Sequence, residues 1–220
     1  MRHLRYCTRT LGLIALLAVA SLAEQAPPHG QRYSFEAFRA RMEDPQRAQW
    51  QKPDEVVRML HLRRGSRIAD IGAGTGYFSV RLARAVGTSG RVYAVDIDRR
   101  AVQYMRRRFR RAHLPQAIAV EGAATDPKLP QRVDLVFICD TWHHIEDRVT
   151  YARTLRRSLR PRGRVVIVDF KPEADPAIGP PREMRLSAEQ IAGELQQAGF
   201  HVAVAADFLP LQYVLTATSE

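Results

Sequence analysis

At residues 68–78 the chain reads Ile68-Ala69-Asp70-Ile71-Gly72-Ala73-Gly74-Thr75-Gly76-Tyr77-Phe78. The apolar residues before Gly72 predict a short buried strand, and the apolar residues after Gly76 predict a helix. Glycines between the two allow positive φ angles without a Cβ penalty and let the backbone approach a ligand closely. The stretch therefore predicts a ligand-binding turn between a strand and a helix.

Strand and helix patterns alternate on both sides of this turn, which is typical of βαβ units around a parallel sheet. We expect strands at 67–71, 91–96, 117–120, 133–139 and 164–169, and helices from Pro53 to Gly65 and at 77–86, 99–112, 147–159 and 187–198. Apolar runs at 200–206 and 211–217 could form a closing antiparallel pair. Before Pro53 we expect a linker to about residue 32, followed by one or two short helices over 33–50.

The composition is that of a single globular domain, with 220 residues, 45% of them apolar and 26% charged. The net charge of +11 could attract nucleic acid, an anionic membrane surface or acidic substrates. The excess is almost wholly arginine, including the outer face of the helix at 99–112. We interpret these arginines as solvated surface and expect no specific nucleic-acid partner.

The first 23 residues have the pattern of a secretory signal peptide. Arginines at positions 2, 5 and 9 precede an apolar run of 12 residues, and Ser21-Leu22-Ala23 supplies small residues at a cleavage site. The run is shorter than the roughly 20 residues of a membrane span, so no transmembrane helix is expected. The predicted location is periplasmic or secreted; a true start at Met42 would instead place the protein in the cytoplasm. Cleavage would leave Cys139 as the single cysteine, which excludes an intramolecular disulfide and four-cysteine zinc sites.

The ligand of the glycine turn is indicated by spacing and charge. Asp96 follows Gly76 by 20 residues and ends a predicted strand, where its carboxylate could accept hydrogen bonds from a ribose diol. The pattern is G-x-G-x-G, and Tyr77 stands where a dinucleotide-binding turn has its third glycine. Asp70 adds a negative charge, which suits a cationic ligand better than a pyrophosphate. A nicotinamide-dependent oxidoreductase is therefore a disfavoured alternative.

Residues 68–78 resemble the cofactor loop of class I S-adenosylmethionine-dependent methyltransferases, whose ligand carries an ammonium and a sulfonium. The resemblance extends through 92–98, 133–137 and 159–164 and covers about 53–217. The chain is most similar to the ubiquinone/menaquinone C-methyltransferase group, which acts on small molecules. This resemblance implies an α/β, Rossmann-like three-layer sandwich with a mostly parallel seven-stranded sheet and an antiparallel last strand. It also implies S-adenosylmethionine as the cofactor.

The resemblance also assigns candidate cofactor contacts by position. They are Asp70, Gly72, Ala73, Gly74, Gly76, Asp96, Ile97, Thr125, Asp126 and Asp140. The glycines, Asp70 and Asp140 would lie at the methionine end, and Asp96 would hold the ribose hydroxyls. Thr125 and Asp126 would lie near the adenine amine, although Asp126 could instead cap the turn that contains Pro127.

Residues after the fourth predicted strand are candidates for the chemistry of methyl transfer. His143 or His144 could remove a proton from the acceptor, because imidazole titrates near neutral pH. Both could instead line the substrate pocket or serve as polar residues at a helix start. Trp142 could stack on a ligand or pack in the core. Asp140 and Asp169 could hold Mg²⁺, but Phe170 replaces the Asn of metal-dependent relatives, so no metal is expected.

The expected function is transfer of a methyl group, by direct displacement, to a small organic acceptor. Residues 1–23 would be the signal peptide, 24–52 a linker and lid, and 53–220 the methyltransferase domain. The segments 24–52 and 171–186 are expected to form loops at the ligand-binding edge and to select the substrate. A second hypothesis is a non-catalytic exported binding protein on the same fold, which would use its arginines to hold an anionic partner.

Overall fold

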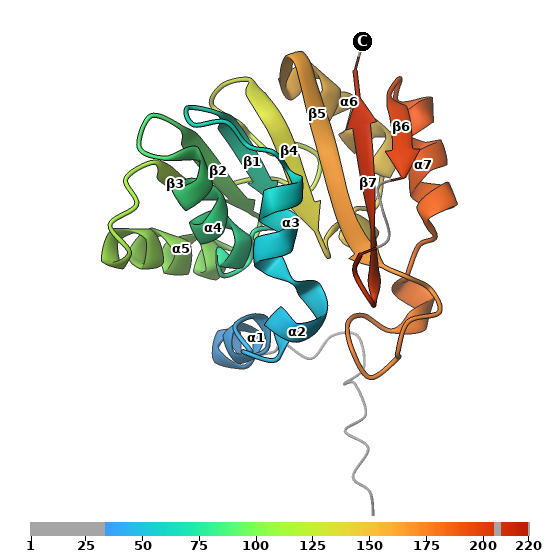
Figure 1. Cartoon of the computed structure of the whole chain (residues 1–220), viewed down its shortest axis with the longest axis horizontal. Coiled ribbons are helices and arrows are strands. Elements are labelled where there is room, and N and C mark those ends of the chain that lie inside the picture. Colours follow the sequence, from blue (N-terminus) through green and yellow to red (C-terminus); the bar gives the residue numbers. More distant parts are fainter. Residues whose placement is uncertain (1–33, 205–207, 220) are drawn as a thin grey trace, which may run out of the picture. The chain divides into compact units, whose positions relative to one another are not determined.

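A seven-stranded sheet lies at the centre of the structure, with strand order β3-β2-β1-β4-β5-β7-β6 (Figure 1). Its strands are β1 (Arg67–Ile71), β2 (Arg91–Asp96), β3 (Ala117–Glu121), β4 (Val133–Cys139), β5 (Leu159–Phe170), β6 (His201–Val204) and β7 (Gln212–Thr218). Strands β1 to β5 pair in parallel, whereas β7 is antiparallel to both β5 and β6. The expected sheet with an antiparallel closing strand is confirmed.

The coordinates are a computed structural model that describes residues 34–204 and 208–219. These residues belong to one compact unit, Tyr33–Glu220. The predicted signal peptide at 1–23 and the linker to residue 32 lie outside the described residues. Within the described ranges, no helix combines the length and apolar character that a membrane span requires.

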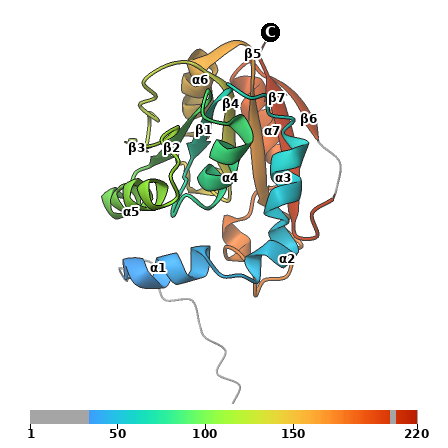
Figure 2. The same cartoon turned by 60° about the vertical axis from the view of Figure 1, so that its left-hand side comes forward.

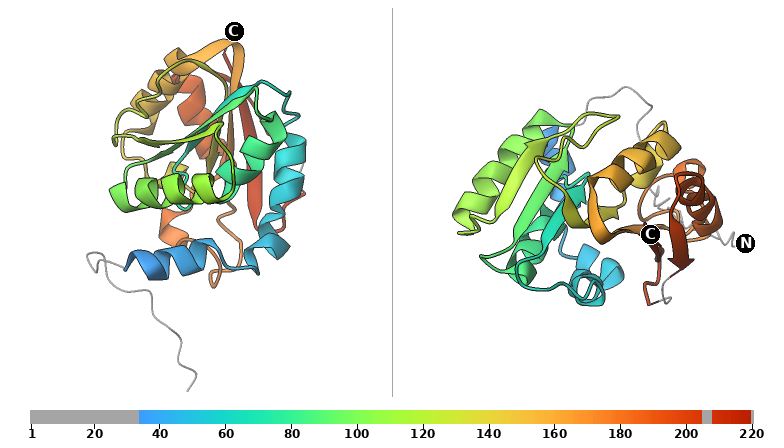
Figure 3. Two further views of the ribbon diagram at one scale, coloured as in Figure 1. Left: turned by 90° about the vertical axis from the view of Figure 1, so that its left-hand side faces the viewer. Right: turned by 90° about the horizontal axis from the view of Figure 1, so that it is seen from above.

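Helices cover both faces of the sheet and complete a three-layer sandwich. They are α3 (Pro53–Met59), α4 (Tyr77–Val86), α5 (Arg99–Arg111), α6 (Arg148–Ser158) and α7 (Ala188–Gln197). Side chains of α3, α4 and α5 share one apolar core with Ile68 and Phe137, and those of α6 and α7 share the other with Ala69 and Ile138. Figure 3 shows α3 and α6 on opposite sides of the sheet. Successive strand residues thus point to opposite cores, as the pleat requires.

Four further helical elements precede α3 or lie in connections between strands and helices. They are α1 (Phe35–Met42), α2 (Arg47–Gln51) and the 3₁₀ turns η1 (Trp142–His144) and η2 (Arg182–Met184). The expected one or two short helices over 33–50 are therefore two. Both belong to the same compact unit as the sheet.

Two predicted boundaries are wrong. The helix that begins at Pro53 ends at Met59 and not at Gly65, because His61 adopts a positive φ of 45° and turns the chain toward β1. Strand β5 begins at Leu159 and not at residue 164. Val133 pairs with Leu159 and Leu135 with Arg164, so the extra residues form an irregularity in β5 that periodicity does not reveal.

The glycine turn between β1 and α4 has the conformation that its sequence predicts. Gly72, Gly74 and Gly76 have φ angles of 69°, 56° and 77°, all in the left-handed region. A Cβ atom on Gly72 would lie 2.2 Å from the Oγ1 atom of Thr141, which follows β4. The turn therefore depends on glycine both for its backbone angles and for the close approach of Thr141.

Substitution of Gly72 by alanine is expected to destabilise the protein by at least about 2 kcal/mol, because it adds left-handed strain and a clash with Thr141. The matched control is Gly193→Ala in α7, where a new Cβ would meet no atom within 4 Å. That change should be neutral or stabilising by up to about 1 kcal/mol. Urea unfolding of both variants measures the difference, and equal midpoints for the two variants would contradict the prediction.

Candidate functional site

The predicted site residues converge at the carboxyl ends of β1, β2 and β4. Strand β1 lies between β2 and β4, so the chain order reverses beside β1. Ligands of open α/β sheets bind at such a switch point, outside the carboxyl ends of the strands. The glycine turn follows β1, Asp96 ends β2, and Asp140 follows β4. The topology thus brings together residues that are far apart in the sequence.

Asp96 is bonded directly to the glycine turn. One of its carboxylate oxygens accepts a hydrogen bond from the Gly74 amide at 2.8 Å, and the other accepts from the Asp98 amide at 2.8 Å. Burial raises the pKa of Asp96, and these backbone donors oppose the shift. The next residue, Ile97, is 67% exposed. An anchored acid beside an exposed apolar side chain is an arrangement that suits a ribose joined to a flat base.

Asp70 lies beneath the glycine turn. It is buried, and its carboxylate accepts a hydrogen bond from the Ser79 hydroxyl at 2.5 Å, which joins β1 to α4. Burial raises the pKa of Asp70 to about 7; the Ser79 hydroxyl opposes this rise and the negative charge of Asp96 adds to it. Asp70 therefore acts on the site through its charge and by holding α4 against the sheet.

Asp140 is the centre of a polar cluster built from three distant segments. It has a positive φ of 51° and accepts hydrogen bonds from the side-chain amides of Gln51, at 2.8 Å, and Gln212. The guanidinium of Arg47 lies 3.6 Å from the same carboxylate. Burial raises the pKa of Asp140 to about 6, and the positive Arg47 opposes that shift. The contacts of Arg47, Gln51 and Gln212 are not predictable from the sequence, because no local pattern links these residues to Asp140.

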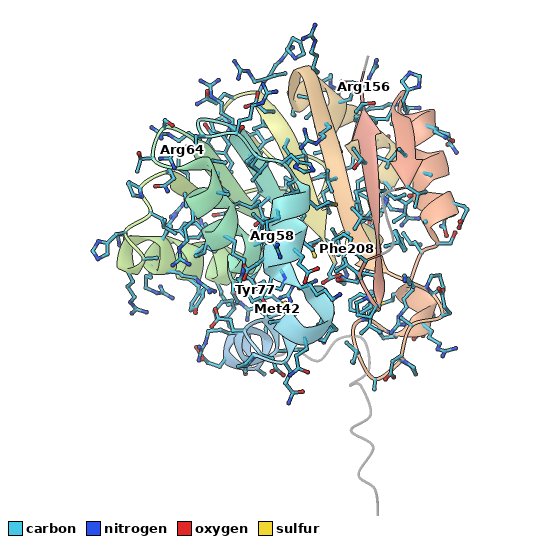
Figure 4. All side chains as sticks on the ribbon, in the orientation of Figure 1. Met42, Arg58, Arg64, Tyr77, Arg156 and Phe208 are labelled. Atoms are coloured by element: carbon cyan, nitrogen blue, oxygen red, sulfur yellow. The ribbon has the colours of Figure 1, made fainter. Side chains whose placement is uncertain are left out.

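Arg47 places a buried cation beside Asp140. The side chain is buried, with its guanidinium 4.4 Å from the centre of the Tyr77 ring and a hydrogen bond to the Met42 carbonyl at 2.9 Å. Figure 4 labels Met42 and Tyr77 at this end of the sheet. An acid and an aromatic face around a buried cation are features that also suit a sulfonium or ammonium group.

Helices α1 and α2 lie at the end of the sheet that carries the glycine turn (Figures 1 and 2). The Phe38 ring is 3.4 Å from where a Gly74 Cβ would be. Glu43 accepts a hydrogen bond from the Tyr104 hydroxyl at 2.8 Å and pairs with Arg108, which also donates to the Thr75 carbonyl at 3.1 Å. Residues 34–52 are thus tied to α5 and to the turn itself.

His143 forms a buried pair with Asp169. Its Nδ1 atom lies 3.0 and 3.1 Å from the two carboxylate oxygens, and both side chains are at most 2% exposed. The Phe170 amide also donates to Asp169 at 2.8 Å. A proton on Nδ1 leaves Nε2 of His143 as an acceptor. The His144 ring lies beside the His143 ring, with centres 4.2 Å apart and planes tilted by 46°. Desolvation, aided by the neighbouring His143, lowers the pKa of His144.

The surroundings of Trp142 distinguish its two alternatives, whereas those of Thr125 and Asp126 do not. Trp142 is fully buried and donates to Glu194 at 2.9 Å, so it packs in the core. Thr125 and Asp126 are exposed, and Asp126 accepts a hydrogen bond from the Lys128 amide at 2.8 Å. The turn-capping bond of Asp126 is therefore present, and a contact with adenine stays a prediction.

The segment 171–186 is held by its own buried arginine. Arg185 donates to the carbonyl oxygens of Ala174 at 2.6 Å, Ile178 at 2.8 Å and Pro180 at 3.0 Å. Its guanidinium also lies 5.4 Å from the centre of the Phe170 ring. This segment follows the carboxyl end of β5 and lies at the same end of the sheet as α1 and α2 (Figure 1).

Residues 68–163 match the family model described as a methyltransferase domain. A demethylmenaquinone methyltransferase from a Geobacillus species is 25% identical over 117 residues, which are 53% of this chain and 50% of that protein. The 27-O-demethylrifamycin SV methyltransferase of Amycolatopsis mediterranei is 32% identical over 126 residues, which are 56% of this chain and 46% of that protein. The chain spans about half the length of these curated relatives.

A solved structure has a very similar fold. The crystal structure of a SAM-dependent methyltransferase from Aquifex aeolicus aligns with a TM-score of 0.79 and 23% identity, and the match covers 86% of this chain and all of that one. The methyltransferase-domain match and the curated relatives bear out the resemblance to methyltransferases, and the solved structure confirms the Rossmann-like fold.

The raised pKa of Asp70 predicts a stability that depends on pH. The folded protein binds this proton more tightly than the unfolded chain does, so the contribution is present at low pH and is lost as pH rises from the ordinary value of 3.8 to about 7. Relative to wild type, Asp70→Asn should gain up to roughly 4 kcal/mol of unfolding free energy between pH 4 and pH 8.

Urea unfolding across this pH range provides the measurement. Asp98→Asn is the control, because Arg100 lowers the pKa of Asp98. Relative to wild type, this variant should lose unfolding free energy as pH rises, which is opposite to the change expected for Asp70→Asn. Parallel pH curves for wild type and Asp70→Asn would show that Asp70 titrates normally.

Proposed function

We propose that this chain binds S-adenosylmethionine and transfers its methyl group to a small organic acceptor by direct displacement. The observation that carries the proposal is the hydrogen bond from the Gly74 amide to Asp96, which joins a left-handed glycine turn to an acid at the switch point of the sheet. The methyltransferase-domain match over residues 68–163 supports the same conclusion.

The residues present fit this cofactor. Asp96 would hold the ribose hydroxyls, and the exposed Ile97 would pack against the adenine. Gly72, Ala73, Gly74 and Gly76 bring the backbone close to the ligand, and a side chain on Gly74 would meet Phe38. Asp140, already paired with the cationic Arg47, would face the positive methionine end. When bound, S-adenosylmethionine supplies a methyl group activated by its sulfonium.

The chain itself must align the acceptor and remove its proton. His143 is the candidate base, and Asp169 is a positioning residue that holds Nδ1 and so directs Nε2 toward the acceptor. The buried carboxylate would also stabilise the imidazolium formed by proton transfer. His144, with its lowered pKa, would stay neutral beside it.

The proposed acceptor is a small organic molecule that is methylated on oxygen or carbon. The two relatives are named for demethylmenaquinone and for 27-O-demethylrifamycin SV. A base at the site fits an acceptor that loses a proton from oxygen or carbon as the methyl group is added. Residues 34–52 and 171–186 lie at this end of the sheet and would select this acceptor and exclude water.

The cofactor proposal is tested by calorimetric titration of S-adenosylhomocysteine into the full chain. We expect micromolar affinity, and Asp96→Ala should weaken it about 10- to 100-fold, because charged hydrogen bonds contribute about 1.5–3 kcal/mol. Asp54→Asn, at an exposed position of α3, is the control and should leave the affinity unchanged. No binding by folded wild-type protein would favour the non-catalytic binding hypothesis.

The proton-transfer proposal is tested by methyl transfer from labelled S-adenosylmethionine to an acceptor found by screening. His143→Gln should reduce kcat about 100-fold or more, because general-base catalysis contributes at least this factor. Affinity for S-adenosylhomocysteine should not change. His144→Gln is the matched control and should reduce kcat less. An equal loss of kcat in both variants would exclude His143 as the specific base.

A further inference from the structure

A concave site lies at the opposite end of the sheet from the glycine turn. It is an open groove of about 610 Å³ beside Leu159, the first residue of β5. Five arginines line it: Arg132 before β4, Arg153, Arg156 and Arg157 of α6, and Arg160 of β5. Figure 4 labels Arg156 at this end and Met42 and Tyr77 at the other. We call this the arginine groove.

The positive charge of the arginine groove is largely uncompensated. None of its described lining residues is acidic. Arg160 forms an ion pair with Asp134 at 3.0 Å, whereas the other four arginines form no ion pair with a described residue. Arg153 donates only to the Gln197 carbonyl at 3.4 Å, and Arg157 to the Thr154 hydroxyl at 3.0 Å. Most of the guanidinium donors therefore have no partner among the described residues.

Stabilisation of helix α6 by positive charge explains the positions of only some of these arginines. Arg156 and Arg157 lie in the last turn of α6, where cations are favoured by the helix dipole. Arg132 and Arg160 come from other segments and gain nothing from that dipole. Gly199 also leaves room for Arg156, since a Cβ there would lie 3.3 Å from its guanidinium. The convergence of separate segments indicates a site for an anion.

We infer that the arginine groove binds a ligand that carries two or more phosphate groups. Guanidinium forks pair with phosphate oxygens in a bidentate manner, and several arginines in one groove suit more than one phosphate. The volume lies within the range of small-molecule sites. The phosphates could belong to a soluble ligand or to lipid headgroups, which share this chemistry. This inference does not depend on the proposed methyl transfer.

The test is calorimetric titration of inorganic tripolyphosphate into the full chain at about 0.1 M salt. Wild type should bind, and Arg153→Gln/Arg156→Gln should bind at least about tenfold more weakly. The matched control is Arg106→Gln/Arg107→Gln on α5, which removes the same charge from exposed positions and should change the affinity less than about twofold. Arg132→Gln, in a loop, provides a second groove variant if the double variant folds poorly.

Two further measurements separate the sources and guard against general charge effects. If wild type sediments with phosphatidylglycerol vesicles and the groove variants do not, the phosphates belong to lipid. If wild type binds tripolyphosphate but not the vesicles, the phosphates belong to a soluble ligand. Equal weakening in groove and α5 variants would overturn the inference, as would the absence of both kinds of binding. If the protein bound only an oligonucleotide, and the groove variants abolished that binding, the arginine groove would be a nucleic-acid site and the inference would be wrong. Affinity for S-adenosylhomocysteine should be the same in all variants.

Discussion

The chain turns from β1 into α4 through three residues with positive φ, and this turn positions the rest of the candidate site. Gly72 leaves space for Thr141 after β4, and Gly74 donates to Asp96 at the end of β2. Asp70 holds α4 against β1 through Ser79. Because these contacts reach the ends of three neighbouring strands, the conformation of one short turn sets the relative positions of the acids around it.

Residues 34–52 show how distant parts of the chain complete this site. Arg47 and Gln51 reach Asp140 from α2, and Gln212 reaches it from β7. Glu43 connects the same segment to α5 through Tyr104. Buried acids need such partners, because a carboxylate without them would pay the full cost of desolvation. The polar cluster therefore couples the packing of residues 34–52 to the charge state of the site.

Charge is distributed unevenly between the two ends of the sheet. Asp70, Asp96 and Asp140 gather three carboxyl groups at the carboxyl end, and burial raises their pKa values. A cationic ligand there would stabilise their ionised forms. The arginine groove at the other end favours an anion. A net charge of +11 describes neither environment, since both depend on which residues the fold brings together.

The sequence by itself determined the sheet, the glycine turn and most elements: β1, α4, β2 and β4 have the predicted bounds, because their apolar runs and flanking glycines act locally. It also placed Asp96 and Asp140 at strand ends. Only the tertiary structure decided that Trp142 packs in the core, that His143 pairs with Asp169 and that Gln51 contacts Asp140. These contacts join residues 26 to 89 positions apart, so they exist only once parallel strands lie side by side and two buried cores form.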